Sequence, residues 1–266
     1  MQIFNEIAIV ESNKMIAKNI YEARLFSPLI ASSSKPGQFI NILPKSNWSY
    51  IMRRPMSVSS QNNKQIEIIY KVFGEGTKII SEWKEKDKID IIGPLGNFWN
   101  NYDNLHPILI GGGVGIAPII NLHNKFNSLK IKHTLIVGAR DKEEHFINHN
   151  PEKNIFLTTD NEDYGIKGNV VNALKLIHKN SSYDDMKVFT CGPHGMIKGV
   201  DTYCRMNNLD CDFALETIMA CGIGICQGCT IVRNNDNSEY SYRKKFALAC
   251  IDGPIFNIKD LDKNAL

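Results

Sequence analysis

Four cysteines towards the C-terminal end of the chain have a spacing that suits a metal cluster. Cys221, Cys226 and Cys229 lie in one glycine-rich stretch, and Cys250 follows further along. The pattern C-x4-C-x2-C with a distant fourth cysteine is that of plant-type [2Fe-2S] ligands. Glycines between the cysteines let the backbone wrap closely round a cluster and direct N–H groups at the sulfur atoms. The sequence therefore predicts a [2Fe-2S] cluster held by these four thiolates.

A zinc site and four unrelated buried cysteines are the alternatives to this interpretation. Zinc ribbons usually use two C-x2-C pairs, and this stretch has only one. Three cysteines inside one glycine-rich loop make a chance arrangement a poor explanation. Cys204 and Cys211 lie outside the pattern, and we expect them in the core or on the surface.

A basic motif near residue 54 resembles the Arg-x-(Tyr/Pro)-(Ser/Thr) motif of the ferredoxin–NADP reductase superfamily, which binds a flavin. It reads Arg53-Arg54-Pro55-Met56-Ser57. The guanidinium of Arg54 suits a pyrophosphate, because it offers charge and directional donors. In this interpretation the Ser57 hydroxyl, or a backbone N–H nearby, bonds the edge of the flavin ring. Pro55 fixes the chain between the two contacts, and Met56 is counted with them as a flavin-binding residue. The alternative is an exposed pair of arginines.

Two glycine-containing blocks follow the basic motif in the order found in that superfamily. The first spans Ile69, Tyr70 and Lys71 and then Gly76 and Thr77, and the second is the stretch 93–98, GPLGNF. N–H groups at the start of a helix bind phosphate, which favours Gly76 and Thr77 as FAD contacts. Tyr70 either packs on the flavin or is an ordinary aromatic residue of the core. Together these blocks predict FAD.

A nicotinamide site is predicted from two further turns. Gly112, Gly113 and Gly115 follow a short apolar strand and precede a helix, although they do not form the G-x-G-x-x-G fingerprint. Cys191, Gly192 and Pro193 end a later strand and match the superfamily's Cys-Gly-Pro motif. Since ligands bind at the carboxyl ends of parallel strands, both turns should contact NAD(H). The alternatives are a plain tight turn and a buried cysteine.

The stretch 140–144, RDKEE, bears on which nicotinamide binds. Its acidic residues would repel a 2′-phosphate and favour NAD, whereas Arg140 and Lys142 argue for NADP. We expect NAD.

The elements that must position these motifs fall into three parts. Strands are predicted at 2–10, 38–43 and 65–72, with a helix at 77–84. Strands at 108–110, 133–138, 155–159, 187–190 and 210–215 then alternate with helices at 116–125, 142–148, 168–179 and 194–207. The fold class is therefore a two-domain β-barrel plus α/β protein. We expect an antiparallel flavin-binding barrel (1–100), a parallel-sheet nicotinamide-binding domain (101–210) and a [2Fe-2S] subdomain (211–266) with a polar hairpin at 234–241.

Composition excludes several other classes. The 266 residues carry a net charge of +3 without any Lys/Arg block, so nucleic acid is not an expected partner. There is no run of 18 apolar residues that would cross a membrane and no signal-peptide pattern at the start. We expect a cytoplasmic protein, in which clustered cysteines are more often ligands than disulfides.

The whole series of motifs is similar to the electron transfer subunits of dihydroorotate dehydrogenase B. The most specific blocks are 215–232, LETIMACGIGICQGCTIV, and 249–256, ACIDGPIF. The resemblance implies that electrons pass between NAD+ and an FMN-containing catalytic subunit through FAD and the cluster, in pyrimidine (UMP) biosynthesis. It also implies a heterotetramer with two of each subunit and no catalytic residue in this chain. Thr217-Ile218 and Asn161-Glu162-Asp163 depart from the family's usual residues.

Related reductase subunits are the nearest competing interpretation. These are the flavin subunits of a sulfide dehydrogenase and of an NADH-dependent ferredoxin:NADP oxidoreductase. An alternative of another class is a non-catalytic metal-binding scaffold protein with a degenerate reductase domain. The intact flavin motifs argue against a scaffold.

Overall fold

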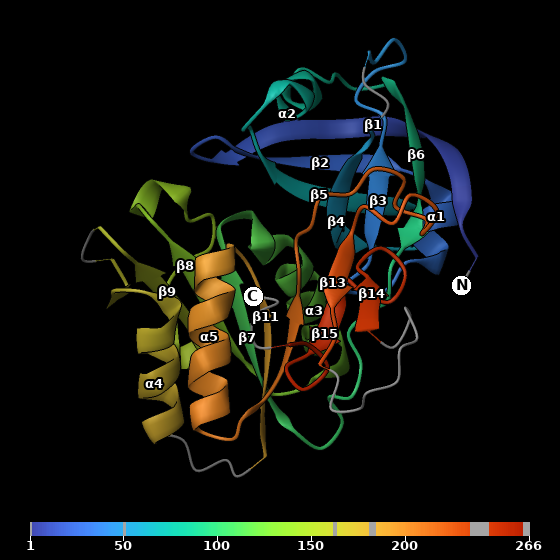
Figure 1. The fold of residues 1–266 in the computed structure, drawn as a ribbon. Helices are drawn as coiled ribbons and strands as arrows, with labels where there is room; N and C mark the ends of the chain where they lie inside the picture. Colours follow the sequence, from blue (N-terminus) through green and yellow to red (C-terminus); the bar gives the residue numbers. More distant parts are fainter. Residues whose placement is uncertain (1, 50–51, 162–163, 181–184, 235–244, 263–266) are drawn as a thin grey trace.

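The first part of the chain is a closed antiparallel barrel (Figure 1). The computed structural model describes residues 2–49, 52–161, 164–180, 185–234 and 245–262. Around the barrel the strand order is β1-β2-β5-β4-β3-β6. The strands are β1 (Phe4–Ala17), β2 (Ile20–Phe26), β3 (Phe39–Ile42), β4 (Arg54–Gln61), β5 (Gln65–Lys71) and β6 (Lys88–Leu95), with the helices α1 (Pro28–Ser33) and α2 (Glu75–Ser81). The predicted barrel is confirmed.

Alternation along β3 explains how the barrel joins the rest of the molecule. Ile40 and Ile42 enter the barrel core, whereas Phe39 packs in a different core together with residues of the C-terminal part. Asn41 shares the outward side with Phe39, because successive strand residues point to opposite faces. One face of the barrel wall is thus covered by the end of the chain.

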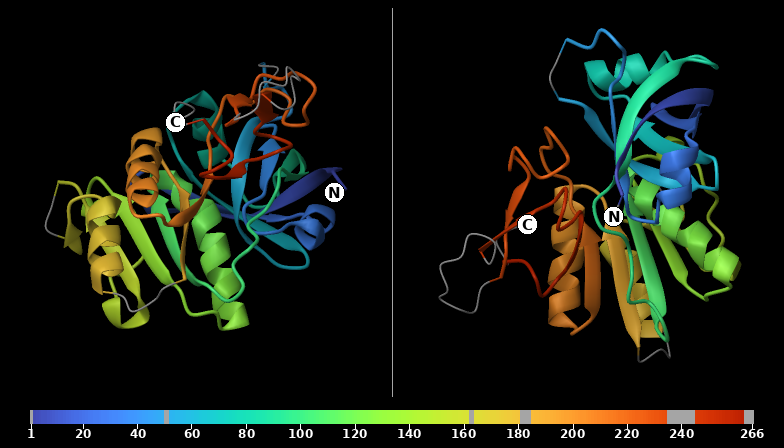
Figure 2. Two further views of the ribbon diagram at one scale, coloured as in Figure 1. Left: turned by 60° about the horizontal axis from the view of Figure 1, so that its bottom comes forward. Right: turned by 90° about the vertical axis from the view of Figure 1, so that its right-hand side faces the viewer.

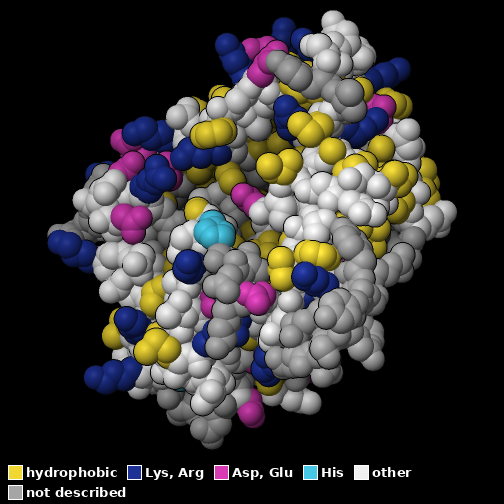
Figure 3. All heavy atoms as spheres, in the orientation of Figure 1, with side chains coloured by type: hydrophobic (Ala, Val, Ile, Leu, Met, Phe, Trp, Pro, Cys, Tyr) yellow, Lys and Arg dark blue, Asp and Glu magenta, His cyan; other side chains and the backbone are white. Residues whose placement is uncertain are grey.

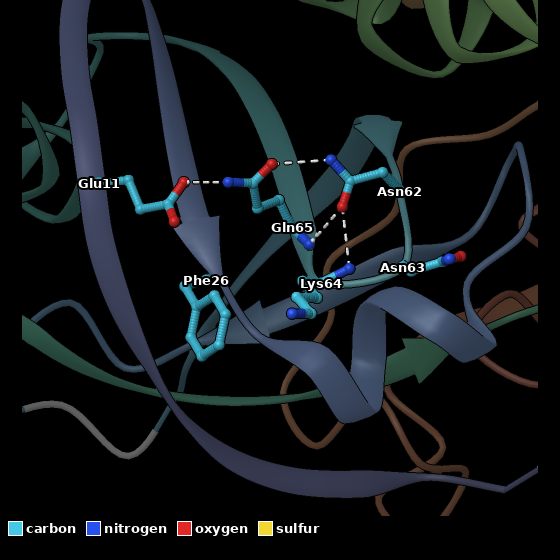
Figure 4. Close-up of a pocket in the computed structure, with 6 residues that line it drawn as sticks. All are labelled: Glu11, Phe26, Asn62, Asn63, Lys64 and Gln65. Carbon is cyan, nitrogen blue, oxygen red and sulfur yellow. Dashed lines mark hydrogen bonds between the residues drawn. The ribbon is translucent and has the colours of Figure 1, made fainter.

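The turn between β4 and β5 is held by its own polar side chains (Figure 4). The Oδ1 atom of Asn62 accepts the backbone N–H groups of Lys64 and Gln65 at 2.8 and 2.9 Å. The Gln65 amide in turn donates to Glu11 on β1 at 2.7 Å. Asn favours turns through such local hydrogen bonds. The shallow pocket at this turn is therefore accounted for by the hairpin.

The second part is a seven-stranded sheet of order β10-β9-β8-β7-β11-β12-β15, parallel except for β15. Its strands are β7 (His106–Gly112), β8 (Thr134–Ala139), β9 (Ile155–Thr159), β10 (Ile166–Lys167), β11 (Met186–Cys191), β12 (Asp210–Ala214) and β15 (Ile255–Asn257). Both faces are covered: α3 (Ile116–Leu129) lies on one, and α4 (Val170–Asn180) and α5 (His194–Met206) lie on the other (Figure 2). The predicted parallel-sheet domain is confirmed.

The predicted helix at 142–148 is wrong. Only one short turn of 3-10 helix forms there, η2 (Lys142–Glu144). Its acidic side chains reach across to the barrel, where Glu143 pairs with Lys18 and Glu144 pairs with Lys71. Two inter-domain ion pairs thus form where the residue types predicted a longer helix.

The third part follows β12 and stands beside the barrel and α5 (Figure 2). It contains a small two-stranded sheet, β13 (Thr230–Val232) with β14 (Phe246–Leu248), before β15 joins the large sheet. Buried Lys187 lies 2.8 Å from Asp212, which also accepts the Asn257 amide of β15 at 2.7 Å. This network anchors the end of the chain to the large sheet. Most of the predicted hairpin at 234–241 lies outside the described residues, and the domain limits stay a prediction.

Among the residues that the structure describes, no helix is both long enough and apolar enough to cross a bilayer.

A partly buried histidine pair, His123 of α3 with His133, predicts a loss of stability in acid. The Nδ1 atom of His133 lies 2.8 Å from the Ile131 carbonyl, which only accepts, so His133 Nε2 is left to accept from His123 Nδ1 at 2.7 Å. Burial lowers both pKa values, and that of His123 falls to about 4 with the help of His133. Because the folded-state pKa lies below the unfolded value of about 6.5, the stabilisation is complete above pH 6.5 and is lost as the pH falls towards 4.

We expect a decrease of roughly 1–2 kcal/mol in the free energy of unfolding over this range, after allowing for partial exposure. Urea unfolding of the wild-type chain and of His123→Gln at pH 7 and pH 4.5 measures it. The variant should lose less stability than the wild type between the two pH values. If the wild type and the variant lose the same free energy of unfolding between the two pH values, the histidine pair is not the source of the pH dependence.

Candidate cofactor sites

The four predicted cluster cysteines come together as two pairs. The Sγ atoms of Cys229 and Cys250 lie 3.2 Å apart and are buried. Cys221 and Cys226 form the second pair, with the backbone N–H of Cys226 3.4 Å from the Cys221 sulfur. Each iron of a two-iron cluster takes two thiolates, so two pairs fit a [2Fe-2S] cluster ligated by four cysteines. Within the described residues no three His, Cys, Asp or Glu side chains converge to hold a single ion.

Backbone donors surround the first of these thiols. Burial would raise the pKa of Cys221, but N–H groups of Cys226, Ile223 and Ile225 lower it to about 7. Burial and the neighbouring Cys229 raise the pKa of Cys250 to about 12. A ligand must be the thiolate. The loop thus stabilises the charged form of half-buried Cys221, while buried Cys250 would need a bound cation to ionise.

Two loop glycines are required where they stand. Gly222 has a φ of +72° and Gly224 a φ of +81°. A Cβ on Gly222 would overlap the Asn41 side chain, and one on Gly224 would overlap Ile251. Glycine alone adopts this backbone readily and leaves room for such contacts.

The structure separates the roles of the two adjacent arginines. The Arg53 guanidinium forms a bidentate ion pair with the Asp90 carboxylate, with N–O distances of 3.1 and 3.0 Å. Arg54 donates to backbone carbonyls and lies against Gly76, where an added Cβ would come within 2.7 Å of its Nε. Arg54 and Gly76 therefore lie against each other, while Arg53 stabilises the barrel.

The remaining predicted flavin residues lie on both faces of the barrel wall. Pro55 pairs with Asn41, and Ser57 pairs with Phe39, which places both on the outward side of β4. Met56 packs against the barrel core. Thr77 accepts the N–H groups of Phe73 and Gly74 and so caps α2.

Tyr70 lies inside the barrel. Its ring stacks on Tyr21 at 5.7 Å, and its hydroxyl donates to the Asn13 amide oxygen at 2.8 Å. Burial raises its pKa far above the ordinary value. The ring is a core residue, which was the alternative interpretation, and packing on a flavin does not fit this position. Its neighbours face outward: Ile69 packs against Ala117 of α3, and Lys71 reaches the cleft described next.

A cleft of about 590 Å³ lies between the barrel and the carboxyl ends of the parallel strands, on the hollowed face seen in Figure 3. Gly112, Gly113 and Pro193 line it, as predicted for a nicotinamide site. Thr158 at the end of β9 also lines it, and its buried hydroxyl has no hydrogen-bond partner among the described residues. Such a group suits a polar ligand. The rule that ligands sit at strand ends would have identified Thr158 from the sequence.

The two predicted nicotinamide turns pack directly on each other. A Cβ on Gly115 would lie 2.5 Å from the Gly192 nitrogen and 2.6 Å from the Cys191 carbonyl carbon. Cys191 itself is buried beneath this contact, and burial raises its pKa so that it stays a neutral thiol. The glycines therefore let the turns that follow β7 and β11 pack against each other.

The acidic residues expected to select NAD are largely used elsewhere. Glu143 and Glu144 pair with lysines of the barrel. The cleft is instead lined by Arg140 and Asp160, with Glu144 at its barrel side. Charged residues inside and outside the stretch 140–144 thus line the cleft, and the selection of NAD stays a prediction.

Replacing Arg54 with Gln is expected to weaken FAD binding about tenfold, because a charged donor beside Gly76 is lost. Fluorescence titration of the flavin-stripped chain with FAD measures the dissociation constant. Arg24→Gln is the control, since Arg24 pairs with Glu67 on the barrel surface. If the Arg54 variant binds FAD as tightly as the wild type does, Arg54 does not contribute to the FAD site.

Two family descriptions match separate parts of the chain. Residues 216–262 match the iron–sulfur cluster binding domain of dihydroorotate dehydrogenase B. Residues 109–202 match an oxidoreductase NAD-binding domain. The iron–sulfur interpretation of the cysteines is thereby confirmed against zinc at the level of the domain.

Full-length relatives agree with these matches. The chain is 31% identical to the dihydroorotate dehydrogenase B (NAD(+)) electron transfer subunit of Fusobacterium nucleatum, over 97% of this chain and 98% of the relative. It is 32% identical to the same subunit of Bacillus pumilus, over 95% and 96%. Among solved structures, an NADH-dependent reduced ferredoxin–NADP oxidoreductase superposes with a TM-score of 0.84 and 25% identity, covering 98% of this chain and 91% of the other.

Proposed function

This chain belongs to the electron transfer subunits of dihydroorotate dehydrogenase B, and on that premise we propose that it carries electrons between NAD(H) and an FMN-containing catalytic subunit through FAD and one [2Fe-2S] cluster. The catalytic subunit would interconvert dihydroorotate and orotate in pyrimidine biosynthesis. One observation supports this route above others. Phe39 and Leu95 of the barrel wall share a hydrophobic core with the ligands Cys229 and Cys250.

The barrel residues are proposed to hold and orient the flavin. Arg54 beside Gly76 would bind the pyrophosphate, and Ser57 on the outward side of β4 would bond the ring. FAD, when bound, takes up two electrons as a hydride and releases them one at a time, as a one-electron cluster requires. Pro55 and Ser57 of β4 pair with Asn41 and Phe39 of β3, and the Asn41 amide bonds the Cys221 carbonyl of the cluster loop. The proposed flavin strand therefore lies one strand away from that loop.

The cleft is proposed to bind NAD(H) against the barrel. Gly112 and Gly113 would approach the pyrophosphate closely, and Thr158 would supply a polar contact. Lys71 lines the same cleft from the barrel side. The nicotinamide would therefore face the flavin strand at the boundary of the two domains.

The cluster loop is proposed to contact the catalytic subunit. Ile218 is 80% exposed and Ile225 is 77% exposed, and Ile223 and Ile251 are exposed beside the cysteines. Exposed apolar side chains round a redox centre suit a protein interface. A complex with two of each subunit is the proposed assembly. We also propose a cytoplasmic location, because clustered cysteines there are more often metal ligands than disulfides.

Anaerobic purification of the chain, alone and with an FMN-containing candidate partner, tests the proposal. One FAD with about two iron and two sulfide per chain, bleached by NADH, is the expected composition. Dihydroorotate should bleach the same bands only when the partner is present. Reduction of a ferredoxin but not of orotate would instead favour the oxidoreductase whose structure is so similar. A colourless, zinc-containing chain would overturn both.

A further inference from the structure

A buried amide joins the barrel wall to the cluster loop. Asn41 is fully buried on β3, in a strand whose other residues are Phe39, Ile40 and Ile42. Its Nδ2 donates to the Cys221 carbonyl at 3.1 Å, across 180 residues of sequence. Its Oδ1 has no hydrogen-bond partner among the residues described. A polar group at such a position costs stability unless it is bonded, so its presence calls for a role.

The position of Asn41 is between the two proposed cofactor sites. Its register partners are Pro55 on β4 and Ile92 on β6. Directly paired strand residues point to the same face. The amide therefore lies beside the flavin strand on one side and the first cluster ligand on the other. Gly222 allows this approach, because a Cβ there would overlap the amide nitrogen.

We propose that Asn41 is a positioning residue for electron transfer, which holds Cys221 at a fixed place relative to the flavin strand. The inference rests on the proposed function. Electron transfer between two centres falls steeply with their separation, so a hydrogen bond that fixes one ligand also fixes the rate. The Oδ1 of the same buried amide is left to accept a hydrogen bond that the described residues do not supply.

Three variants of the full chain test the role of Asn41. Asn41→Leu keeps the size of the side chain and removes its hydrogen bond to the Cys221 carbonyl. Asn41→Ser shortens the side chain, so that it cannot reach this carbonyl. Asn121→Leu is the matched control. The Asn121 amide of α3 also donates to a backbone carbonyl of the barrel, that of Val58 at 2.9 Å, but on the nicotinamide side. Stopped-flow absorption after NADH separates flavin reduction from cluster reduction, and electron paramagnetic resonance of the reduced cluster reports its ligand geometry.

Both Asn41 variants should reduce the cluster about fivefold more slowly, as expected for loss of about one hydrogen bond. The electron paramagnetic resonance spectrum of the reduced cluster should change, and the rate of flavin reduction should stay the same. Loss of the cluster with FAD retained would also support the role, provided Asn121→Leu keeps its cluster. Unchanged resonance and rate in the Asn41 variants would overturn it. So would a chain that loses FAD and cluster together, because Asn41 would then be a core residue. If the wild type lacks FAD or cluster, the proposed function fails instead.

Discussion

Replacing Cys250 with Ser is expected to remove the [2Fe-2S] cluster and to leave FAD bound. Cys250 comes from a separate segment, and its sulfur lies 3.2 Å from that of Cys229. Without it one iron would keep a single protein thiolate, and a Ser hydroxyl does not ionise as a thiol does. Iron, sulfide and flavin assays on the purified variant measure the outcome. We expect iron and sulfide near zero and one FAD per chain.

A buried cysteine outside the cluster provides the control for this variant. Cys204 on α5 lies in the core with Cys211. Cys204→Ala should lower stability by about 1 kcal/mol and keep the cluster. A Cys250→Ser chain with a full complement of iron and sulfide would refute the ligand assignment. Loss of iron in Cys204→Ala as well would show that the assay reports folding and not ligation.

Replacing Gly115 with Ala is expected to weaken NADH binding on the order of 100-fold and to lower stability by about 3 kcal/mol. The new Cβ would lie 2.5 Å from the Gly192 nitrogen. The atoms that the new Cβ would meet belong to the backbone of Cys191 and Gly192. Relief of the clash would therefore move the backbone of the two turns that lie under the cleft. Rates of flavin reduction at several NADH concentrations measure the apparent dissociation constant, and thermal unfolding measures the stability.

Gly195→Ala separates this clash from a general effect of alanine. Gly195 is in α5 at the edge of the same cleft, and no atom lies within 4 Å of its ideal Cβ. Alanine is the better helix former there, so the melting temperature should stay the same or rise slightly. If Gly115→Ala binds NADH like the wild type, the contact between the two turns has no role in the nicotinamide site.

The sequence alone determined the features that depend on local spacing. The positions of Cys221, Cys226 and Cys229 within one loop, followed by Cys250, predict a cluster, because three of its ligands come from one tight loop. The glycine turn at 111–115 is equally local, since a strand, a turn and a helix follow one another there. Alternating strands and helices also predicted the parallel sheet, whose connections impose that order.

Only the tertiary structure decided what each long side chain contacts. The sequence places Arg53 and Arg54 side by side, but Asp90 on another strand binds the first and leaves the second beside Gly76. Tyr70 enters the barrel because strand alternation turns it inward. The stretch 142–144 forms only a short turn, whose glutamates pair with lysines of the barrel.

Asn41 marks the limit of sequence reasoning most clearly. A single polar residue in an apolar strand indicates that something is bonded there, but not what. Its partner, the Cys221 carbonyl, lies 180 residues away. Contacts between segments so distant are set by how the barrel wall packs against the end of the chain, and no local pattern of residue types encodes that packing.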